Sequence, residues 1–316
     1  MSKTLITGCA GFIGSTLLDR LLDLNYKVIG LDNFSTGREQ FINNAKKNNN
    51  FEFHNIDLLK NDIDEYFKDV KEVFHFAANA DVRNGVNNPT KDLEQNTIVT
   101  SRVLEASRKA GVEKFFFSST GSIYGESERI PTPENTNFPI QTSLYGASKL
   151  ACEGLITSYS YAYGIKSWIF RFVSILGERY THGHVYDFYY SLKNNPKLLH
   201  VLGDGNQKKS YLYVQDCIDA IFHASKYLNN EINIVNLGVD DTCKVIDSVS
   251  WISQKLNLNP EIKFSGGKRG WVGDNPLIHL DTSFINNSGW MPKTSIKEGI
   301  IKTLNYLESN KWLFDK

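Results

Sequence analysis

The sequence predicts an α/β protein: a doubly wound parallel sheet followed by a smaller second part. Short runs of β-branched and aromatic residues recur through residues 3–172, and most are separated by segments with helical periodicity. This alternation is typical of βαβ units, whose strands pair in parallel. After about residue 173 the pattern loosens into loops bearing glycine, asparagine and proline between shorter elements. We expect this second half to form a cap over the edge of the sheet.

Six runs of strand-forming residues carry the prediction of the sheet. The first helix is the clearest of those between them, because apolar residues at three- and four-residue intervals share one face. These residues are Ile13, Leu17, Leu18, Leu21 and Leu22. That face is expected to pack on the sheet. The expected strands are KTLIT, KVIGLD, FEFHNID, EVFHFAA, KFFFSS and SWIFRF.

The composition narrows the class of protein. The chain has 316 residues, of which 41% are hydrophobic, enough for one large domain or two joined ones. Its 35 basic residues balance 35 acidic ones, so the overall charge favours neither a nucleic acid nor a membrane partner. The sequence contains no long apolar run and no basic-then-apolar leader, so we expect neither a membrane span nor export.

The four cysteines, Cys9, Cys152, Cys217 and Cys243, are scattered without CxxC pairs or histidine spacing. This spacing argues against both a disulfide framework and a zinc site, so no metal is expected. Unpaired cysteines fit a reducing compartment. We therefore expect the protein to be cytoplasmic.

The stretch TLITGCAGFIG, residues 4–14, places Gly8, Gly11 and Gly14 after the first strand, which we expect to end at Thr7, and around the start of the first helix near Phe12. The N–H groups of such a loop, together with a helix N-terminus, can bind the pyrophosphate of a dinucleotide. Asp32 closes KVIGLD eighteen residues later, where dinucleotide-binding sheets carry an acidic residue for the adenosine ribose. A carboxylate there repels a 2′-phosphate and favours NAD, although Arg38 leaves NADP open. The alternative is that the glycines only form a tight turn.

The segment SLYGASK places Tyr145 and Lys149 four residues apart, on one face of a helix that continues to Tyr163. An ammonium several ångströms from a phenol supplies about 3 kcal/mol at an effective dielectric near 20. We expect this to lower the tyrosine pKa by roughly two units, toward that of a general base. Thr120 ends the run KFFFSST near the same edge of the sheet and could hold a substrate oxygen. The alternative is a surface pair on an ordinary helix.

At these residues the sequence resembles the extended short-chain dehydrogenase/reductase family of NAD-dependent nucleotide-sugar epimerases and dehydratases. The UDP-glucose 4-epimerases are its reference branch, and the resemblance covers nearly the whole chain. It is carried by GCAGFIG, LDNFSTG, HFAANADV, FSSTGSIYG, YGASK, FRFVSILGER, DGNQKKSYLYVQD and RGWVGD.

The resemblance implies a Rossmann domain for NAD and a smaller, discontinuous domain for a nucleotide sugar. We expect residues 1–172 plus about 210–240 to form the first domain, and about 173–209 plus 241–316 to form the second. Members usually form dimers through two helices of each subunit, here about 91–110 and 145–163. A homodimer is therefore expected.

Carried over position by position, the resemblance makes Thr120, Tyr145 and Lys149 the catalytic set, with Lys149 also holding the nicotinamide ribose. It assigns Gly8, Gly11, Phe12, Ile13 and Gly14 to the pyrophosphate, Asp32 and Asn33 to the adenosine ribose, Asp57 and Leu58 to adenine, Ala77 and Ala78 to the nicotinamide side, and Asn96 to support from the following helix.

The substrate end departs from the family pattern. Ser174 stands where an asparagine normally contacts the diphosphate, and Lys209 replaces the phosphate-binding arginine, keeping the charge without bidentate geometry. Arg269 and Asp274 lie two residues further apart than usual. We still expect Lys209 and Arg269 to bind phosphate and Asp274 to bind the nucleotide ribose. His182 and His184 either touch sugar hydroxyls or belong to a solvated loop.

The reaction expected is oxidation at carbon 4 of a nucleotide-diphosphate sugar. Gly121 and Ser122 stand where 4,6-dehydratases carry an acid pair, and no cysteine for epimerisation at carbons 3 and 5 lies near them. The 4-keto sugar could then be reduced from the other side, giving a 4-epimerase, or be released, giving a 4-dehydrogenase. The motifs leave both open, as well as UDP- or GDP-linked hexoses and heptoses. A non-catalytic NAD-binding regulator is a third possibility, against which the retention of Tyr145 and Lys149 speaks.

Overall fold

The computed structural model of the protein describes residues 3–79, 83–137 and 139–314. The chain divides into two compact units. The first unit comprises Met1–Ile123, Ser143–Arg171 and Ile221–Val235, and the second comprises Tyr124–Thr142, Phe172–Ala220 and Asn236–Lys316. The principal difference from the expected boundaries is residues 124–142, which belong to the second unit. The assignment of NAD to one domain and nucleotide sugar to the other stays a prediction.

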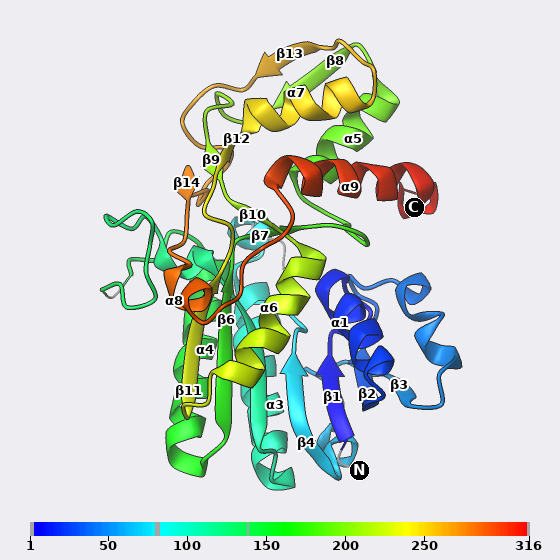
Figure 1. The fold of residues 1–316 in the computed structure, drawn as a ribbon, viewed down its shortest axis with the longest axis vertical. Helices are drawn as coiled ribbons and strands as arrows, with labels where there is room; N and C mark the ends of the chain where they lie inside the picture. Colours follow the sequence, from blue (N-terminus) through cyan, green and yellow to red (C-terminus); the bar gives the residue numbers. More distant parts are fainter. Residues whose placement is uncertain (1–2, 80–82, 138, 315–316) are drawn as a thin grey trace. The chain divides into compact units, whose positions relative to one another are not determined.

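The first unit contains a seven-stranded sheet in the order β11-β6-β5-β4-β1-β2-β3, which confirms the predicted doubly wound α/β fold. The pairs β1–β2, β2–β3, β1–β4 and β4–β5 are parallel. Helices lie on both faces, with α1 on one and α3 and α4 on the other (Figure 1). The strands are β1 (Lys3–Thr7), β2 (Lys27–Asp32), β3 (Phe51–Asn55), β4 (Val70–His75), β5 (Lys114–Thr120), β6 (Lys166–Phe172) and β11 (Ile232–Leu237).

The helices that follow these strands have the expected positions, with one exception. The expected helix 91–110 is interrupted: a short α2 (Pro89–Asp92) is followed by a π-helix, η5 (Leu93–Ile98), before α3 (Val99–Ala110) begins. A π-turn changes the face on which the following residues lie. The other helices are α1 (Phe12–Asp23), α4 (Leu144–Tyr163) and α6 (Val214–Tyr227), with shorter turns η1 (Glu39–Ile42), η2 (Ala45–Lys47), η3 (Asp64–Phe67), η4 (Asn84–Val86) and η6 (Gly121–Tyr124).

Aromatic side chains hold the central strands together. Phe74 of β4 stacks on Phe116 of β5 with ring centroids 4.3 Å apart, and Phe116 stacks on Trp168 of β6 at 4.8 Å. All three are buried. Since both faces of the sheet are covered, its strands are near-continuous apolar runs, which is why they were recognisable in the sequence.

The second unit contains small sheets and helices. Strand β7 pairs with β10, β8 with β13, and β9 with both β12 and β14. Its elements are β7 (Ser174–Leu176), α5 (His184–Asn194), β8 (Leu198–Val201), β9 (Lys208–Lys209), β10 (Tyr211–Tyr213), β12 (Cys243–Lys244), α7 (Val245–Lys255), β13 (Glu261–Phe264), β14 (Leu277–Ile278), α8 (Ser283–Asn287), α9 (Ile296–Ser309) and η7 (Lys311–Phe314).

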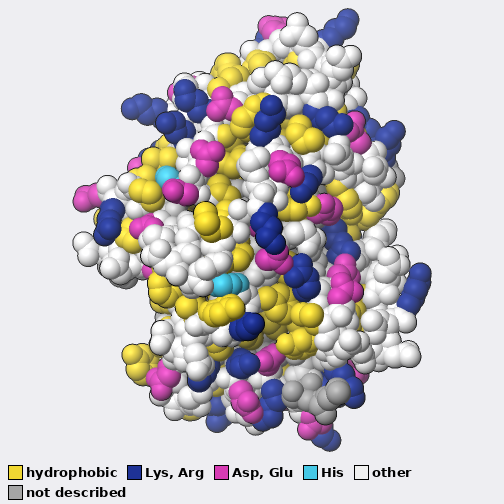
Figure 2. All heavy atoms as spheres, viewed as in Figure 1, with side chains coloured by type: hydrophobic (Ala, Val, Ile, Leu, Met, Phe, Trp, Pro, Cys, Tyr) yellow, Lys and Arg dark blue, Asp and Glu magenta, His cyan; other side chains and the backbone are white. Residues whose placement is uncertain are grey.

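On the face drawn in Figure 2, basic and acidic side chains are interspersed, and no large area carries charge of one sign only. Among the described residues, no helix is long and apolar enough to cross a membrane.

The glycine turn between β1 and α1 depends on close backbone contact. Gly8 has φ +73°, a conformation that glycine adopts without strain, and its N–H donates to Leu31 O at 2.8 Å. A Cβ at Gly8 would lie 2.6 Å from Ala77 N, and one at Gly14 would lie 2.1 Å from Gly8 O. The first turn of α1 therefore sits directly against the loop, with no room for a side chain.

His75 closes β4 and joins three elements through hydrogen bonds. Its Nδ1 lies 2.7 Å from Thr7 Oγ1 of β1, and its Nε2 lies 2.9 Å from Thr100 Oγ1 of α3. Burial lowers the pKa of His75 to about 3, so the ring is neutral in the folded protein near neutral pH.

We predict that Gly14→Ala destabilises the protein, because the added methyl group must displace Gly8 O. The expected loss is about 1–3 kcal/mol of unfolding free energy, measured by urea denaturation. Gly154→Ala is the matched control, since a Cβ there meets nothing within 4 Å and Gly154 lies within α4. This control should be neutral or stabilising by up to about 1 kcal/mol. Equal stability of the two variants would contradict the tight contact.

We also predict that His75 makes the protein sensitive to mild acid. The unfolded histidine, with its ordinary pKa of 6.5, binds a proton below that pH, whereas the folded one does not until about pH 3. Stability is therefore lost as the pH falls below 6.5, by about 2 kcal/mol between pH 7 and pH 5. In His75→Gln this part of the loss should disappear. Parallel curves of unfolding free energy against pH for the two proteins would refute the prediction.

Candidate active site

A pocket of the first unit lies at the carboxyl ends of β1, β2 and β4, where the strand order reverses direction. This is the position at which doubly wound sheets bind ligands. The structure brings eight of the predicted cofactor residues together in its lining: Gly8, Gly11, Asp32, Asn33, Asp57, Leu58, Ala77 and Ala78. Residues that the sequence analysis missed also line it, among them Ser35, Thr36 and Gln95. Ser35 and Thr36 belong to the LDNFSTG motif, which could have indicated them, whereas Gln95 lies in no motif and only the fold places it there.

The carboxylate of Asp32 is fixed in the pocket wall by backbone groups. Its Oδ2 accepts a hydrogen bond from Ala10 N at 2.9 Å, and its Oδ1 accepts one from Phe34 N at 2.8 Å. Burial raises the pKa of Asp32, and these backbone N–H groups lower it. Arg38 is not among the described residues that line the pocket, and its Nη1 lies 3.4 Å from Gly37 O.

The remaining predicted cofactor residues support the pocket from behind. Phe12, Ile13 and Gly14 form the first turn of α1. Asn96, in the π-helix, accepts from Asn79 N at 2.8 Å and donates to Ser148 Oγ at 2.9 Å. It thereby ties the segment that follows β4 to α4. Within HFAANADV, residues 80–82 lie outside the part of the chain that the structure describes.

The structure also brings the predicted catalytic set together. Thr120 ends β5, and Tyr145 and Lys149 lie in the first turns of α4, whose N-cap Ser143 accepts from Gly146 N at 3.0 Å. The hydroxyl of Thr120 lies close enough to the phenol of Tyr145 to lower the pKa of that phenol. The buried ammonium of Lys149 donates to Ser118 O at 2.8 Å.

The protonation of Tyr145 differs from the expectation. Burial raises the pKa of Tyr145, and the nearby hydroxyl of Thr120 lowers it by a smaller amount. The expectation of a more acidic phenol is therefore wrong for the chain by itself, because loss of hydration is the largest effect on the phenol. Burial also lowers the pKa of Lys149 to about 8.

Three of the four predicted substrate residues meet within the second unit. Lys209 Nζ lies 2.7 Å from Asp274 Oδ1, and both side chains are largely buried. Arg269 Nη1 donates to Asp274 O at 2.8 Å, and Arg269 is ion-paired with Glu126. Ser174 is exposed at the start of β7, and among the described residues no contact joins it to the other three. Lys209 and Asp274 thus neutralise each other.

The two histidines of the THGH segment have different surroundings. His182 is exposed, whereas the ring of His184 packs against Tyr211 with centroids 4.7 Å apart. Burial lowers the pKa of His184 to about 3, and the charge of Lys209 adds to the effect. His184 is therefore neutral, and its Nε2 has no hydrogen-bond partner within the described part of the chain.

A half-buried phenol with a hydroxyl and an ammonium close by can exchange a proton with a substrate oxygen. This set and the dinucleotide-type pocket belong to the same unit. Together they suit the removal of a proton and a hydride from an alcohol carbon.

Comparison with known proteins supports this interpretation. The chain is 31% identical over 316 residues to the UDP-glucose 4-epimerase of Mycolicibacterium smegmatis, covering 97% of this chain and 99% of that protein. A crystal structure of UDP-galactose 4-epimerase matches with a TM-score of 0.87 and 34% identity, covering 98% of this chain and 100% of that one. UDP-glucuronic acid 4-epimerase from Bacillus cereus, solved with UDP-glucuronic acid and NAD, matches with a TM-score of 0.90, 28% identity and coverage of 97% and 99%.

The model of one protein family matches residues 4–238. This span contains the glycine turn, the pocket and the whole catalytic set. The chain therefore belongs to the NAD dependent epimerase/dehydratase family.

Proposed function

We propose that this protein is an NAD-dependent 4-epimerase of a UDP-linked sugar. The observation that carries the proposal is the meeting of Thr120, Tyr145 and the buried ammonium of Lys149 in the unit that holds the dinucleotide-type pocket. The relatives named above act on UDP-linked sugars by name, which favours UDP over GDP.

The residues of the pocket fit NAD. A side chain at Gly8 would clash with the backbone at Ala77, so the pocket wall here is bare main chain beside the N-terminus of α1, a position that suits a pyrophosphate. The fixed carboxylate of Asp32 suits ribose hydroxyls and repels a 2′-phosphate, and Arg38 lies away from the pocket lining. We assign adenine to Asp57 and Leu58 and the nicotinamide side to Ala77 and Ala78.

Proton transfer would be the task of Tyr145. When bound, NAD would supply the acceptor for the hydride of carbon 4 and a positive charge near the phenol. Because burial raises the pKa of Tyr145, the chain alone keeps the phenol neutral at pH 7. We infer that the phenolate forms only when a second positive charge joins that of Lys149. Tyr145 would then take the proton of the 4-hydroxyl group while Thr120 holds the same oxygen. The epimer would form when the hydride returns to the opposite face of the 4-keto sugar and Tyr145 gives the proton back to its oxygen.

The turn after β5 favours epimerisation over dehydration. Gly121 and Ser122 offer no carboxylate there, and Glu126, the next acidic residue, is ion-paired with Arg269. Elimination of water needs an additional acid and base near the sugar. At the nucleotide end, we assign Lys209, Arg269 and Asp274 to the diphosphate and ribose, which requires the Lys209–Asp274 pair to rearrange on binding. A cytoplasmic location is part of the proposal, because all four cysteines are buried and unpaired.

We further propose that the protein is a homodimer joined through the segments around α3 and α4. Large apolar side chains on these segments are exposed in the single chain, which is typical of an unsatisfied interface. They are Leu93, Ile98, Leu144, Tyr161 and Tyr163, with exposed fractions of 40% to 79%.

We predict that the purified protein has epimerase activity. The purified protein should interconvert a 4-epimeric pair such as UDP-glucose and UDP-galactose, followed by the NMR signals of the anomeric protons. Tyr145→Phe should lower kcat by about 10²–10⁴-fold while NAD binding, measured by calorimetry, is retained. Tyr26→Phe, which removes a hydroxyl from a partly exposed tyrosine of the same unit, should leave kcat unchanged.

Failure to interconvert any pair from a panel of UDP-sugars would refute the proposal. Accumulation of NADH together with a 4-keto sugar would instead identify a 4-dehydrogenase.

We also predict that the protein is a dimer in solution. Light scattering should give a mass twice that of the 35.8 kDa chain. Replacing Ile98 and Tyr161 together by glutamate should give monomers, because like charges would meet in a desolvated interface. Ile140→Glu, at an exposed apolar residue of the second unit, is the control and should leave the dimer intact. A native protein that is monomeric at micromolar concentration would rule the dimer out.

A further inference from the structure

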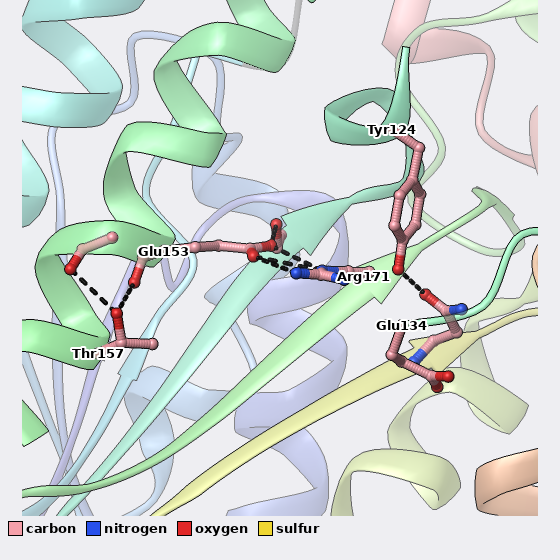
Figure 3. Close-up of polar contacts among 8 residues, drawn as sticks. Tyr124, Glu134, Glu153, Thr157 and Arg171 are labelled. Atoms are coloured by element: carbon pink, nitrogen blue, oxygen red, sulfur yellow. Dashed lines mark hydrogen bonds and ion pairs between the residues drawn. The ribbon is translucent and has the colours of Figure 1, made fainter. Parts of the chain in front are cut away.

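A buried ion pair lies one turn beyond the catalytic lysine. Arg171 of β6 donates to the carboxylate of Glu153 of α4 through Nε, at 3.1 and 3.2 Å, and through Nη2 at 2.7 Å (Figure 3). The side chains of Arg171 and Glu153 are only 9% and 5% exposed. Ser119 Oγ donates to the same carboxylate. The sequence analysis did not single out Glu153, although it follows Lys149 at the same four-residue spacing that joins Lys149 to Tyr145.

Three consecutive residues of β5 contact three consecutive turns of α4. Ser118 O accepts from Lys149 Nζ, Ser119 donates to Glu153, and Thr120 lies close enough to Tyr145 to lower the pKa of its phenol. Because residues four apart share one face of a helix, these contacts fix the rotation of α4 about its axis. They also fix the position of α4 relative to the end of β5. Arg171 extends the set to β6, the next strand of the sheet.

A buried pair of this kind is not explained by stability alone. Removing two charges from water costs several kcal/mol for each ion, and apolar residues of similar volume often stabilise a protein as well or better. The pair has a second effect here, because Glu153 lies close enough to Lys149 to act on its charge.

The charge of Lys149 depends on its surroundings. Burial lowers its pKa to about 8, and negative charge nearby raises it. Of the groups that face it, Glu153 and Cys152 come from α4 and Asp92 from α2. His75 of β4 also faces Lys149 and is neutral above about pH 3.

We propose that Glu153 and Arg171 are a positioning pair for the catalytic set, which holds α4 in register with the end of β5, and that the carboxylate of Glu153 also helps to keep Lys149 charged. The effect of this pair on catalysis rests on the proposed epimerase function. Glu153 and Arg171 are positioning residues and not catalytic ones, since each acts through Lys149 or the strand end.

The test is a direct titration of Lys149 in the full chain. Lysine is labelled with ¹³C at Cε, and the signal of Lys149 is assigned by its loss in Lys149→Met. Glu153→Gln removes a negative charge close to Lys149, so the pKa of Lys149 should fall from about 8 toward 7. Arg171→Gln removes positive charge, so the same pKa should rise. A looser structure alone would not shift the pKa of Lys149 in opposite directions in the two variants.

Two further variants separate charge from position. Ser119→Ala removes the hydrogen bond from the end of β5 to Glu153 and changes no charge. It should therefore lower kcat, while the pKa of Lys149 stays near that of the native protein. Glu113→Gln is the matched control, because Glu113 is an exposed glutamate paired with Lys71 at 2.9 Å. It should change neither property. If Glu153→Gln does not fold, Arg171→Gln and Ser119→Ala carry the test.

The outcomes for the two proposals are distinct. A pKa of Lys149 that is the same in every folded variant, or that moves the same way in both charge variants, overturns the positioning role. In an active enzyme the alkaline limb of kcat should follow the pKa of Lys149. Opposite shifts in a protein that converts no nucleotide sugar would sustain the role of the pair and refute the epimerase function.

Discussion

The active site depends on one buried cation. Lys149 is 1% exposed, and its ammonium has exchanged water for Ser118 O at 2.8 Å and the face of Phe117, whose ring centroid is 4.6 Å away. A buried charge is tolerated only where fixed dipoles and opposite charges replace its hydration. The packing of α4 against the end of β5 places these groups around the ammonium. The same packing sets the position of Tyr145 relative to Thr120, because Tyr145 and Lys149 both lie in the first turns of α4.

The cofactor pocket depends on a complementary constraint, the absence of side chains. Gly8 and Gly14 allow the loop, the first turn of α1 and the backbone at Ala77 to meet at distances that no Cβ permits. Thr7 and His75 secure this contact, since Ala77 N donates to Thr7 Oγ1 at 3.2 Å and Thr7 Oγ1 lies 2.7 Å from His75 Nδ1. Backbone and buried hydrogen bonds therefore shape the pocket, and exposed charges do not.

Local patterns made much of this predictable. The runs that became β1 and β2 were recognised residue for residue, and the glycine turn and the Tyr145–Lys149 spacing are properties of short segments. What escaped prediction depends on distant residues: the Glu153–Arg171 pair, the π-helix that presents Asn96, and the Lys209–Asp274 pair formed across 65 positions. The pKa of Tyr145 was misjudged for the same reason, because the spacing reveals the nearby cation but not the depth of burial.

The two buried lysines show why similar burial can serve different ends. Lys209 is in direct contact with Asp274, so its charge is cancelled locally until that pair opens, and burial lowers its pKa even so. Lys149 donates to a neutral carbonyl oxygen instead, and the nearest carboxylate of its helix, Glu153, is already engaged by Arg171 and Ser119. In the part of the chain that the structure describes, no hydrogen bond joins the Glu153 carboxylate to Lys149. The charge of Lys149 is therefore not cancelled by a direct ion pair, in contrast to that of Lys209.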